Sequence, residues 1–530
     1  MMDWPLTTDR LIDHAAKWHG DREVVWRKAT GDIARRSYAE IHRNARLVSA
    51  ALLAAGVREG DRVGTMAMNS AEHLEAWYGI TGIGAVCHTL NPRLFETQLR
   101  YIIGHAEDRL ILTDGAFAPI LEKVLRGCPT VEQVVFFSDP LEPPDLPVGY
   151  RSYSAFCEVP DDEVVWGGFG ENAAAGLCYT SGTTGDPKGV LYSHRSNVLH
   201  TMMSLQPDVF GFSVRDTVLP VVPMYHANAW GITYSAPAVG ARLVLPGAQL
   251  DATSLCELIE REGVTVAAGV PTVWLGMLDH FRETGIRPTS LERVIIGGAA
   301  ASESLIAGLK EMGIEPIHAW GMTELSPVGG VGTLTPKVAA LPLEEQMPYR
   351  VRQGRSPCGV DLKLLDEEGQ TLPHDGKTSG SLRVSGFAVA SAYYKRDERI
   401  IDEQGYLDTG DIATIDAEGF MRITDRAKDI VKSGGEWISS QEIENAVLLH
   451  PKAALAAVIG KPHERWGERP LLYVQLRPGE QASSDELRSF LSGRIARWWI
   501  PEEIIFIQHI PLGATGKIDK MALRKRLQTA

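Results

Sequence analysis

The feature that most constrains the fold of this chain is a regular alternation of strand-like and helix-like segments. A Ser-Tyr-Ala-Glu capping box and a following glycine bound a helix at about 38–55. Residues 61–68 are strand-like, 71–83 helix-like and 85–90 strand-like, which is a β-α-β pattern. Further strand-like segments, with helical segments between several of them, lie at 109–113, 134–137, 242–245, 264–268 and 293–296. We therefore predict an α/β fold, and 530 residues leave room for more than one domain.

The end of the chain differs from the rest in charge and texture. From about residue 380 short strands and turns replace the longer alternation, and residues 429–530 carry 14 basic and 12 acidic side chains. This segment thus has a net charge of +2. Because the whole chain has a net charge of −14, the remainder has a net charge of −16. Such asymmetry predicts a separate small α+β domain that begins near residue 428.

Composition excludes several classes of function. A net charge of −14 repels a phosphate backbone, so we expect no nucleic-acid binding. The six cysteines lie far apart without a C-x-x-C pair, so neither a disulfide framework nor a structural zinc site is expected, and a reducing cytosol fits best. The first residues lack the pattern of a secretory signal, and prolines and polar residues interrupt the longest apolar stretch, at 216–247. We predict a cytoplasmic protein without a transmembrane segment.

A glycine- and hydroxyl-rich run follows the apolar segment 173–178. It reads Tyr179-Thr-Ser-Gly-Thr-Thr-Gly-Asp-Pro-Lys-Gly189. Backbone N–H groups, hydroxyls and a lysine in one loop suit a polyphosphate, although a surface turn has a similar composition. The run is not a Walker A motif, because Lys188 lies between proline and glycine and is not followed by Ser or Thr.

Five further segments follow in a fixed order, and each one alone would be interpreted as an ordinary turn, cap or linker. They are Gly297-Gly-Ala-Ala300, His318-Ala-Trp-Gly-Met-Thr-Glu324, Gly405-Tyr-Leu-Asp-Thr-Gly-Asp411, Asp425-Arg-Ala-Lys-Asp-Ile-Val-Lys-Ser-Gly-Gly-Glu-Trp-Ile-Ser-Ser440 and Pro511-Leu-Gly-Ala-Thr-Gly-Lys-Ile-Asp-Lys520. With the glycine-rich run, they resemble the motifs of the adenylate-forming (ANL) superfamily, which includes acyl-CoA synthetases, luciferases and peptide-synthetase adenylation domains. The resemblance covers about 175–520.

The resemblance implies a site for ATP and AMP. Trp320 would stack on adenine, Thr323 would bond phosphate, and Asp411 would accept both ribose hydroxyls. Glu324 and Thr184 would hold Mg²⁺. The implied nucleotide-binding residues are Thr180, Ser181, Gly182, Thr183, Thr184, Gly185, Lys188, Gly297, Gly298, Ala299, Trp320, Gly321, Thr323, Asp411 and Arg426.

The resemblance also implies catalytic residues and a moving domain. Lys517, Thr184, Glu324 and Lys188 would stabilise developing charge on the phosphates. Residues 1–427 would form a large AMP-binding and acyl-binding domain and 428–530 a small mobile C-terminal domain, with a hinge at Lys428. The passage for the pantetheine arm of CoA would be lined by Gly434, Gly435, Glu436 and Trp437.

One segment points to a branch of this superfamily. Pro223-Met-Tyr-His-Ala-Asn-Ala-Trp-Gly231 resembles medium- and long-chain fatty acyl-CoA synthetases, in which a tryptophan at the place of Trp230 gates the acyl channel. Trp230 could equally be a core aromatic. The acyl-binding residues implied are His226, Asn228, Trp230 and Val270. Nothing basic lies beside this segment to pair a second carboxylate, so an apolar tail is favoured, and aryl and branched acids stay open.

We therefore predict an ATP-dependent acyl-CoA ligase for a medium- to long-chain or similarly apolar carboxylic acid. It would form an acyl-adenylate and then the CoA thioester, releasing pyrophosphate and AMP. The predicted cofactor is Mg²⁺, with ATP and CoA as cosubstrates. The alternatives are an aryl- or branched-acid CoA ligase, an adenylating enzyme that loads a carrier protein, a luciferase-like oxygenase and, from another class, a catalytically silent acyl or nucleotide sensor. Peripheral membrane contact and a homodimer are left open.

Overall fold

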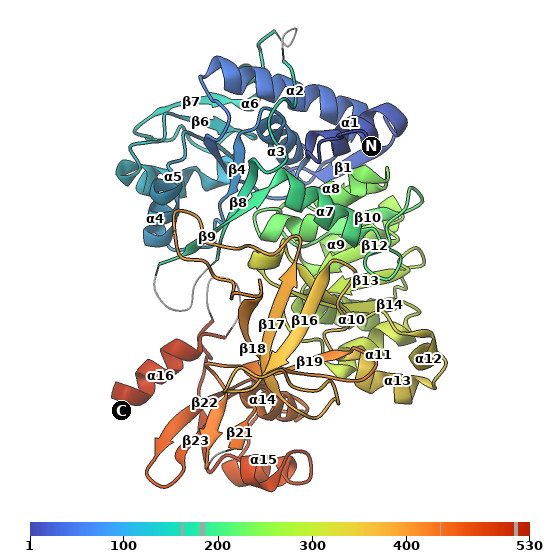
Figure 1. Ribbon diagram of the computed structural model, residues 1–530, viewed down its shortest axis with the longest axis vertical. Helices are drawn as coiled ribbons and strands as arrows, with labels where there is room; N and C mark the ends of the chain where they lie inside the picture. The colour runs from blue at the N-terminus through green and yellow to red at the C-terminus, as the bar shows by residue number, and fades with distance from the viewer. Residues whose placement is uncertain (161–163, 181–185, 435, 513–517, 530) are drawn as a thin grey trace. The chain divides into compact units, whose positions relative to one another are not determined.

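The computed structural model describes residues 1–160, 164–180, 186–434, 436–512 and 518–529 (Figure 1). It confirms the predicted α/β class. The chain divides into two compact units, one of residues 1–361 with 385–407 and the other of 362–384 with 408–530. This division does not follow the predicted boundary at 427/428, because 362–384 and 408–427 form a sheet within the second unit. The predicted hinge at Lys428 concerns motion and stays a prediction.

The first unit contains a seven-stranded sheet in the order β7-β6-β5-β3-β4-β8-β9. All neighbours are parallel except β8 and β9. The strands are β3 (Arg62–Met66), β4 (Val86–Thr89), β5 (Leu110–Thr113), β6 (Gln133–Phe136), β7 (Gly149–Ser152), β8 (Ala174–Thr180) and β9 (Lys188–Ser193). The predicted β-α-β unit is therefore β3, α3 (Ala71–Gly82) and β4.

An eight-stranded sheet in the same unit has the order β15-β14-β13-β12-β10-β11-β1-β2. Its strands are β1 (Glu23–Arg27), β2 (Ile33–Ser37), β10 (Thr217–Pro220), β11 (Arg242–Leu245), β12 (Val266–Gly269), β13 (Arg293–Ile296), β14 (Glu315–Gly321) and β15 (Val328–Val331). Strands β10 and β12 are buried along their whole length, as expected for parallel strands that are covered on both faces. The N-terminal hairpin β1–β2 thus joins strands that follow it by some 200 residues.

Helices pack around these sheets, and α2 contacts both α1 and α3 (Figure 1). The predicted capping box is present at the start of α2: Glu40 N–H donates to Ser37 Oγ at 3.3 Å and Ser37 N–H to Glu40 Oε2 at 2.8 Å. The helices of the unit are α1 (Asp9–Trp18), α2 (Tyr38–Ala54), α3, α4 (Glu96–Ala106), α5 (Ala118–Val124), α6 (Tyr153–Phe156), α7 (His194–Ser204), α8 (Ile232–Ala238), α9 (Ala252–Glu262), α10 (Pro271–Thr284), α11 (Glu303–Glu311), α12 (Pro336–Ala339) and α13 (Leu343–Arg350).

A buried aromatic cluster joins helices α3 and α8. Trp77 Nε1–H donates to the Tyr234 hydroxyl at 2.6 Å, and the Tyr78 hydroxyl donates to the Thr233 carbonyl at 2.8 Å. All three aromatic side chains are almost completely buried, so each polar atom needs such a partner. The cluster lies in the largest apolar core of the unit, whose residues come from both sheets.

In its described residues, the second unit combines two sheets with three α-helices. The first sheet has the order β16 (Val360–Leu365), β17 (Gly380–Gly386), β18 (Leu407–Ile415), β19 (Met421–Arg426). The second has the order β21 (Glu436–Ile438), β20 (Val431–Ser433), β23 (Gly467–Leu476), β22 (Ala453–His463), with β24 (Glu503–Phe506) also on β23. The helices are α14 (Ser440–Leu448), α15 (Ser484–Leu491) and α16 (Lys520–Thr529). In the described part of the chain, no helix has both the length and the apolarity that a membrane crossing needs.

Candidate active site

The segment predicted to contact the acyl group forms a left-handed turn. Residues 227–231 all have positive φ, with 58° at Asn228, 47° at Ala229 and 57° at Trp230. Residues with a Cβ rarely adopt this conformation, which costs roughly 1–2 kcal/mol each. Hydrogen bonds to Asn228 hold the turn: its carbonyl accepts from the Thr233 hydroxyl at 3.4 Å and its side-chain oxygen from the Cys178 thiol at 3.5 Å. Strain of this kind is typical of functional sites.

The turn places Trp230 against the glycine pair that follows β13. A Cβ on Gly297 would lie 3.0 Å from Cη2 of the Trp230 indole, so the ring approaches as closely as it does only because residue 297 is glycine. Gly298 has φ of 80°, and a Cβ there would lie 3.2 Å from Cγ1 of Val270. The structure therefore brings two predicted acyl-binding residues, Trp230 and Val270, onto two predicted nucleotide-binding residues. Asn228 is buried beside them, whereas His226 and Ala299 are exposed.

Two buried histidines hold the backbone around the contact of Trp230 with Gly297. Nε2 of His318 accepts from the Ala301 N–H at 3.4 Å and so ties β14 to the turn after β13. Nε2 of His200 accepts from the Val328 N–H at 3.3 Å, and a Cβ on Gly231 would lie 2.8 Å from the other ring nitrogen. Burial lowers the pKa of both histidines to about 4. Both rings are therefore neutral at physiological pH and act as fixed packing and hydrogen-bonding groups.

Trp320 is the last residue but one of β14, and its ring also packs closely against backbone. Its indole is 8% exposed, and a Cβ on Gly329 of β15 would lie 2.4 Å from the ring. A Cβ on Gly321 would lie 1.8 Å from the Pro327 carbonyl oxygen, so residue 321 must also be glycine. The register of β14 against β15 shifts between these two residues, which turns the chain toward Thr323 and Glu324.

Glu324 is joined to Lys188 through Tyr393, a residue that the sequence did not single out. The Tyr393 hydroxyl donates to Glu324 Oε1 at 2.8 Å, and Lys188 Nζ lies 4.9 Å from the centre of the Tyr393 ring. Burial and the nearby Glu324 raise the pKa of Tyr393, so its hydroxyl stays protonated. Glu324 is 6% exposed, and the Tyr192 hydroxyl fixes the preceding turn by donating to the Thr323 carbonyl at 2.8 Å. The only sequence signal for Tyr393 is the aromatic and basic run Tyr393-Tyr-Lys395.

The ends of the glycine-rich run are anchored by antiparallel pairing of Thr180 with Lys188. The Tyr179 hydroxyl lies 2.6 Å from Nδ1 of His105, and the Tyr394 N–H donates to the Gly189 carbonyl at 2.8 Å. Beneath Tyr179, Nδ1 of the fully buried His88 lies 2.8 Å from Asp108 Oδ2. The predicted residues Ser181, Gly182, Thr183, Thr184 and Gly185 lie outside the described residues.

In the second unit the structure brings together Asp411, predicted to bind the ribose, and Arg426, predicted to reach the nucleotide. Asp411 and Arg426 face each other across β18 and β19, with Arg426 Nε 2.8 Å from Asp411 Oδ1. The Asp411 carboxylate is almost completely buried, so the guanidinium compensates a charge that water cannot reach. Lys428 follows two residues later, and its carbonyl accepts from Arg524 Nη2 at 3.1 Å.

The predicted CoA passage lies at a hairpin of the second unit. Gly434 has φ of 61°, and a Cβ there would lie 3.1 Å from the Trp466 indole. Trp437 and Lys432 line a cavity of about 250 Å³ together with Arg383 and Ile412. Glu436 pairs with Ser433 through the backbone, and Gly435 lies outside the described residues.

The C-terminal motif is described only at its edges. Leu512 and Ile518 form an antiparallel bridge on either side of the gap, and the predicted catalytic Lys517 lies outside the described residues. The neighbouring Lys520 is fixed by the Glu444 carboxylate at 2.7 Å and by the Ser440 hydroxyl at 2.7 Å.

Among the residues that the structure describes, no three His, Cys, Asp or Glu side chains are grouped so that they could hold an ion by themselves. Glu324 is a single buried carboxylate, and Tyr393 connects it to Lys188 at the end of the glycine-rich run. That arrangement fits Mg²⁺, which proteins usually bind through one or two carboxylates plus substrate phosphates.

Known proteins resemble this chain over its full length. A family model described as AMP-binding enzyme matches residues 12–394, and one described as AMP-binding enzyme C-terminal domain matches residues 442–517. A 3-methylmercaptopropionyl-CoA ligase of Ruegeria lacuscaerulensis is 47% identical over 100% of this chain and 99% of its own. A medium-chain-fatty-acid–CoA ligase of Ectopseudomonas oleovorans is 46% identical over 99% and 97%.

Solved structures also resemble this chain over nearly its full length. An anthranilate CoA ligase in complex with anthranoyl-AMP superimposes with a TM-score of 0.86 at 25% identity and covers 99% of this chain and 98% of its own. The order of motifs, the paired α/β units and the two family models agree. This chain belongs to the family of AMP-binding enzymes, the adenylate-forming enzymes that its motifs resemble.

Proposed function

We propose that this chain is an ATP-dependent acyl-CoA ligase that activates an apolar monocarboxylic acid. The observation that carries the proposal is the contact of Trp230 and Val270 with the turn Gly297–Gly298. An acid bound beside the first pair would present its carboxylate to a nucleotide bound beside the second. The relatives' names support the class, since they are CoA ligases for 3-methylmercaptopropionate and for medium- and long-chain fatty acids.

The proposed reaction has two steps. A carboxylate has a poor leaving group, so one of its oxygens attacks the α-phosphorus of ATP, and pyrophosphate leaves. The thiolate of CoA then attacks the acyl carbon of the resulting acyl-adenylate, and AMP leaves with the former carboxylate oxygen. Neither step needs a protein nucleophile.

Charge stabilisation falls to the residues around the phosphates. Lys188 and Lys517 would bind phosphoryl oxygens, and Trp320 would stack on adenine, while Asp411 and Arg426 would hold the ribose end. Positioned charges of this kind act through electrostatic preorganisation. Glu324, oriented by Tyr393, would hold Mg²⁺ together with Thr184; the ion would neutralise charge on the phosphates when bound.

The two steps place different demands on one site. Lys517 is needed at the phosphates in the first step. In the second step the thiol of CoA must reach the acyl carbon, which is bonded to the remaining phosphate through one oxygen. We infer that the C-terminal segment moves between the steps about Lys428, with Gly434 and Trp437 on the CoA side. A cytoplasmic location and a homodimer are further proposals.

The tail of the acid is proposed to be apolar. Trp230 packs in the main apolar core with Val328 and Ile232, and none of the described ion pairs involves the turn 227–231. A short thioether acid is a second candidate, because two relatives at 46–47% identity are 3-methylmercaptopropionyl-CoA ligases.

One assay tests the function and divides these substrates. Pyrophosphate release and acyl-CoA formation are measured with Mg-ATP over acetate, 3-methylmercaptopropionate, octanoate, palmitate, benzoate and succinate, with and without CoA. We expect turnover with the apolar monocarboxylates and little with succinate. Pyrophosphate release without any thioester in the presence of CoA would favour carrier-protein loading, and release with none of the acids would refute the proposal.

A further inference from the structure

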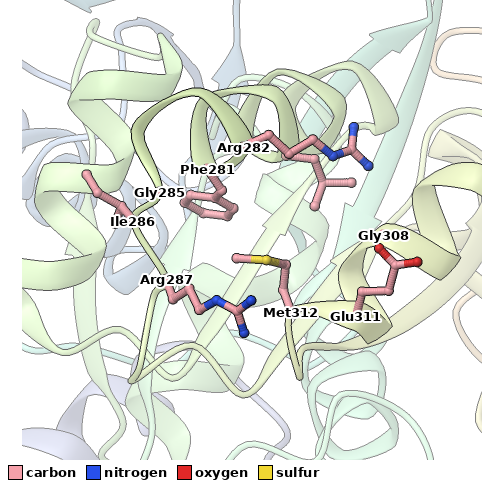
Figure 2. A pocket seen from close by; sticks show the side chains of 9 residues that line it. Phe281, Arg282, Gly285, Ile286, Arg287, Gly308, Glu311 and Met312 are labelled. Carbon is pink, nitrogen blue, oxygen red and sulfur yellow. The ribbon is translucent and has the colours of Figure 1, made fainter.

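A second cavity lies at the C-terminal ends of α10 and α11, where no predicted site residue occurs (Figure 2). Its volume is about 400 Å³, within the roughly 300–1,000 Å³ of small-molecule sites. Gly285 forms its rim: with φ of 72° this glycine ends α10 and turns the chain away from the helix axis.

Apolar side chains form the floor of this cavity, whereas glycines and charged side chains form the rest of its lining. Leu278 and Phe281 from α10 are 2% and 3% exposed, and Met312 ends α11. Figure 2 shows the Phe281 ring and the Met312 side chain facing one another, with Ile286 at one side. Methionine adapts its shape readily to an apolar ligand.

The cationic side chains around the cavity differ in whether a carboxylate lies close enough to neutralise their charge. The C-terminal ends of two helices carry partial negative charge, which Arg282 and Lys310 in their last turns offset. Arg282 also pairs with Asp279 at 3.3 Å, and Lys310 pairs with Glu315 at 2.6 Å. Arg287 lies beyond the end of α10, and no described carboxylate lies within ion-pair distance of it. Figure 2 shows its guanidinium beside Met312, with Glu311 on the other side.

We propose that this cavity is a peripheral binding site for an apolar monocarboxylate. The hydrocarbon chain lies against Phe281 and Met312, and the carboxylate pairs with Arg287. Arginine is suited to this, because its planar fork binds a carboxylate through two parallel hydrogen bonds. A diacid would place its second carboxylate near Glu311, on the other side of Met312 from Arg287. Repulsion between the two carboxylates therefore favours a monocarboxylate over a diacid. The site is separate from that at Trp230 and does not rest on the proposed reaction.

Equilibrium dialysis of the full-length protein with radiolabelled octanoate tests this site. The measurement is made with and without saturating octanoyl sulfamoyl-adenosine, an unreactive mimic of an acyl-adenylate. We expect one octanoate per chain to remain bound in the presence of the mimic. Arg287→Glu should weaken that binding at least tenfold and Arg287→Lys less. Arg126→Glu is the matched control, because Arg126 is also an exposed arginine but lies in another part of the unit.

Each outcome decides the proposal. Loss of all octanoate binding when the mimic is present, equal affinity in Arg287→Glu, or displacement by octylamine would overturn it, the last because a cation would then be the preferred ligand. The arm without the mimic separates this question from the proposed reaction: one additional octanoate there supports a reaction site for acids. Equal binding in both arms would count against that reaction site and leave the peripheral site standing.

Discussion

The indole of Trp230 and the α-carbon of Gly297 adjoin so closely that a Cβ on residue 297 would lie 3.0 Å from the ring. The backbone of Ala319 lies on another side, with its carbonyl oxygen 3.3 Å from the same Cβ position. Neither neighbour is the free end of a flexible chain. The contact thus couples a residue proposed to bind the acid to one proposed to bind the nucleotide.

Gly297→Ala is expected to impair both substrates at once, because the added methyl must displace the indole or the turn. We expect kcat/KM to fall at least tenfold for octanoate and for ATP. Pyrophosphate release at varied acid and varied ATP measures both. The matched control is Gly276→Ala, since a Cβ on Gly276 meets nothing within 4 Å. An unaffected ATP dependence would show that the two sites are not coupled here.

Trp230→Ala is expected to change the preference among acids more than the KM for ATP. Removing the indole opens space beside the proposed acyl group, and hydrophobic pockets distinguish acids by roughly 1–3 kcal/mol per methylene. Relative kcat/KM values across a series from C4 to C16 acids give the profile. A fixed profile with weakened ATP binding would place Trp230 on the nucleotide side instead.

Tyr393→Phe is expected to lower the rate of pyrophosphate release roughly tenfold or more, with a raised requirement for Mg²⁺. The ring beside Lys188 remains, but the hydrogen bond to the Glu324 carboxylate is lost, and such a bond to a charged group contributes roughly 1.5–3 kcal/mol. Initial rates over a Mg²⁺ titration test this. Tyr394→Phe should have little effect, since the Tyr394 hydroxyl has no hydrogen-bond partner among the described residues. Equal effects of the two substitutions would contradict a specific role for Tyr393.

Lys517→Ala is expected to reduce acyl-adenylate formation by on the order of 10²–10³ while sparing thioester formation from supplied acyl-adenylate. The lysine is proposed to act only where charge develops on the phosphates. Single-turnover assays of each half-reaction separate the two, and Lys520→Ala controls for a neighbouring lysine held by Glu444. Near-normal pyrophosphate release by the Lys517 variant would remove its catalytic role.

Lys428→Pro is expected to spare adenylate formation and slow thioester formation. Proline fixes φ near −65° and removes the N–H, so it restricts the rotation proposed at this residue. The test follows adenylate formation without CoA and its consumption after CoA is added, with Lys432→Pro as the control inside β20. If both half-reactions slow equally, Lys428 is not the hinge.

The sequence predicted the fold class and many elements because those signals are local. The capping box at Ser37 and the apolar runs of β11 and β12 depend on residues close in the chain, and the structure reproduces them. Two separate motifs assigned Asp411 and Arg426 to the nucleotide site, and the β-hairpin shows in addition that the two side chains form an ion pair.

Other features depend on contacts between distant residues. Tyr393 meets Glu324 across 69 positions, and no spacing rule connects a tyrosine in a loop with a carboxylate so far away. The left-handed turn at 227–231 could not be predicted from the sequence either, because only Asn228 and Gly231 are residue types that favour positive φ. Residues 362–384 and 408–427 likewise belong together because their strands pair in one sheet. The difference in net charge along the chain, from which the domain boundary was predicted, contains no information on strand pairing.

The pairing of β1 with β11 has a consequence for how the protein is made. Val24 lies opposite Leu243, so the inner edge of the N-terminal hairpin has no native partner until that residue has been synthesised. At about 5–20 residues per second, the ribosome needs roughly 10–40 s to reach it. Throughout that interval Val24, Val25 and Trp26 present an unpaired, apolar strand edge in the nascent chain, which is the kind of segment that chaperones cover and that otherwise aggregates.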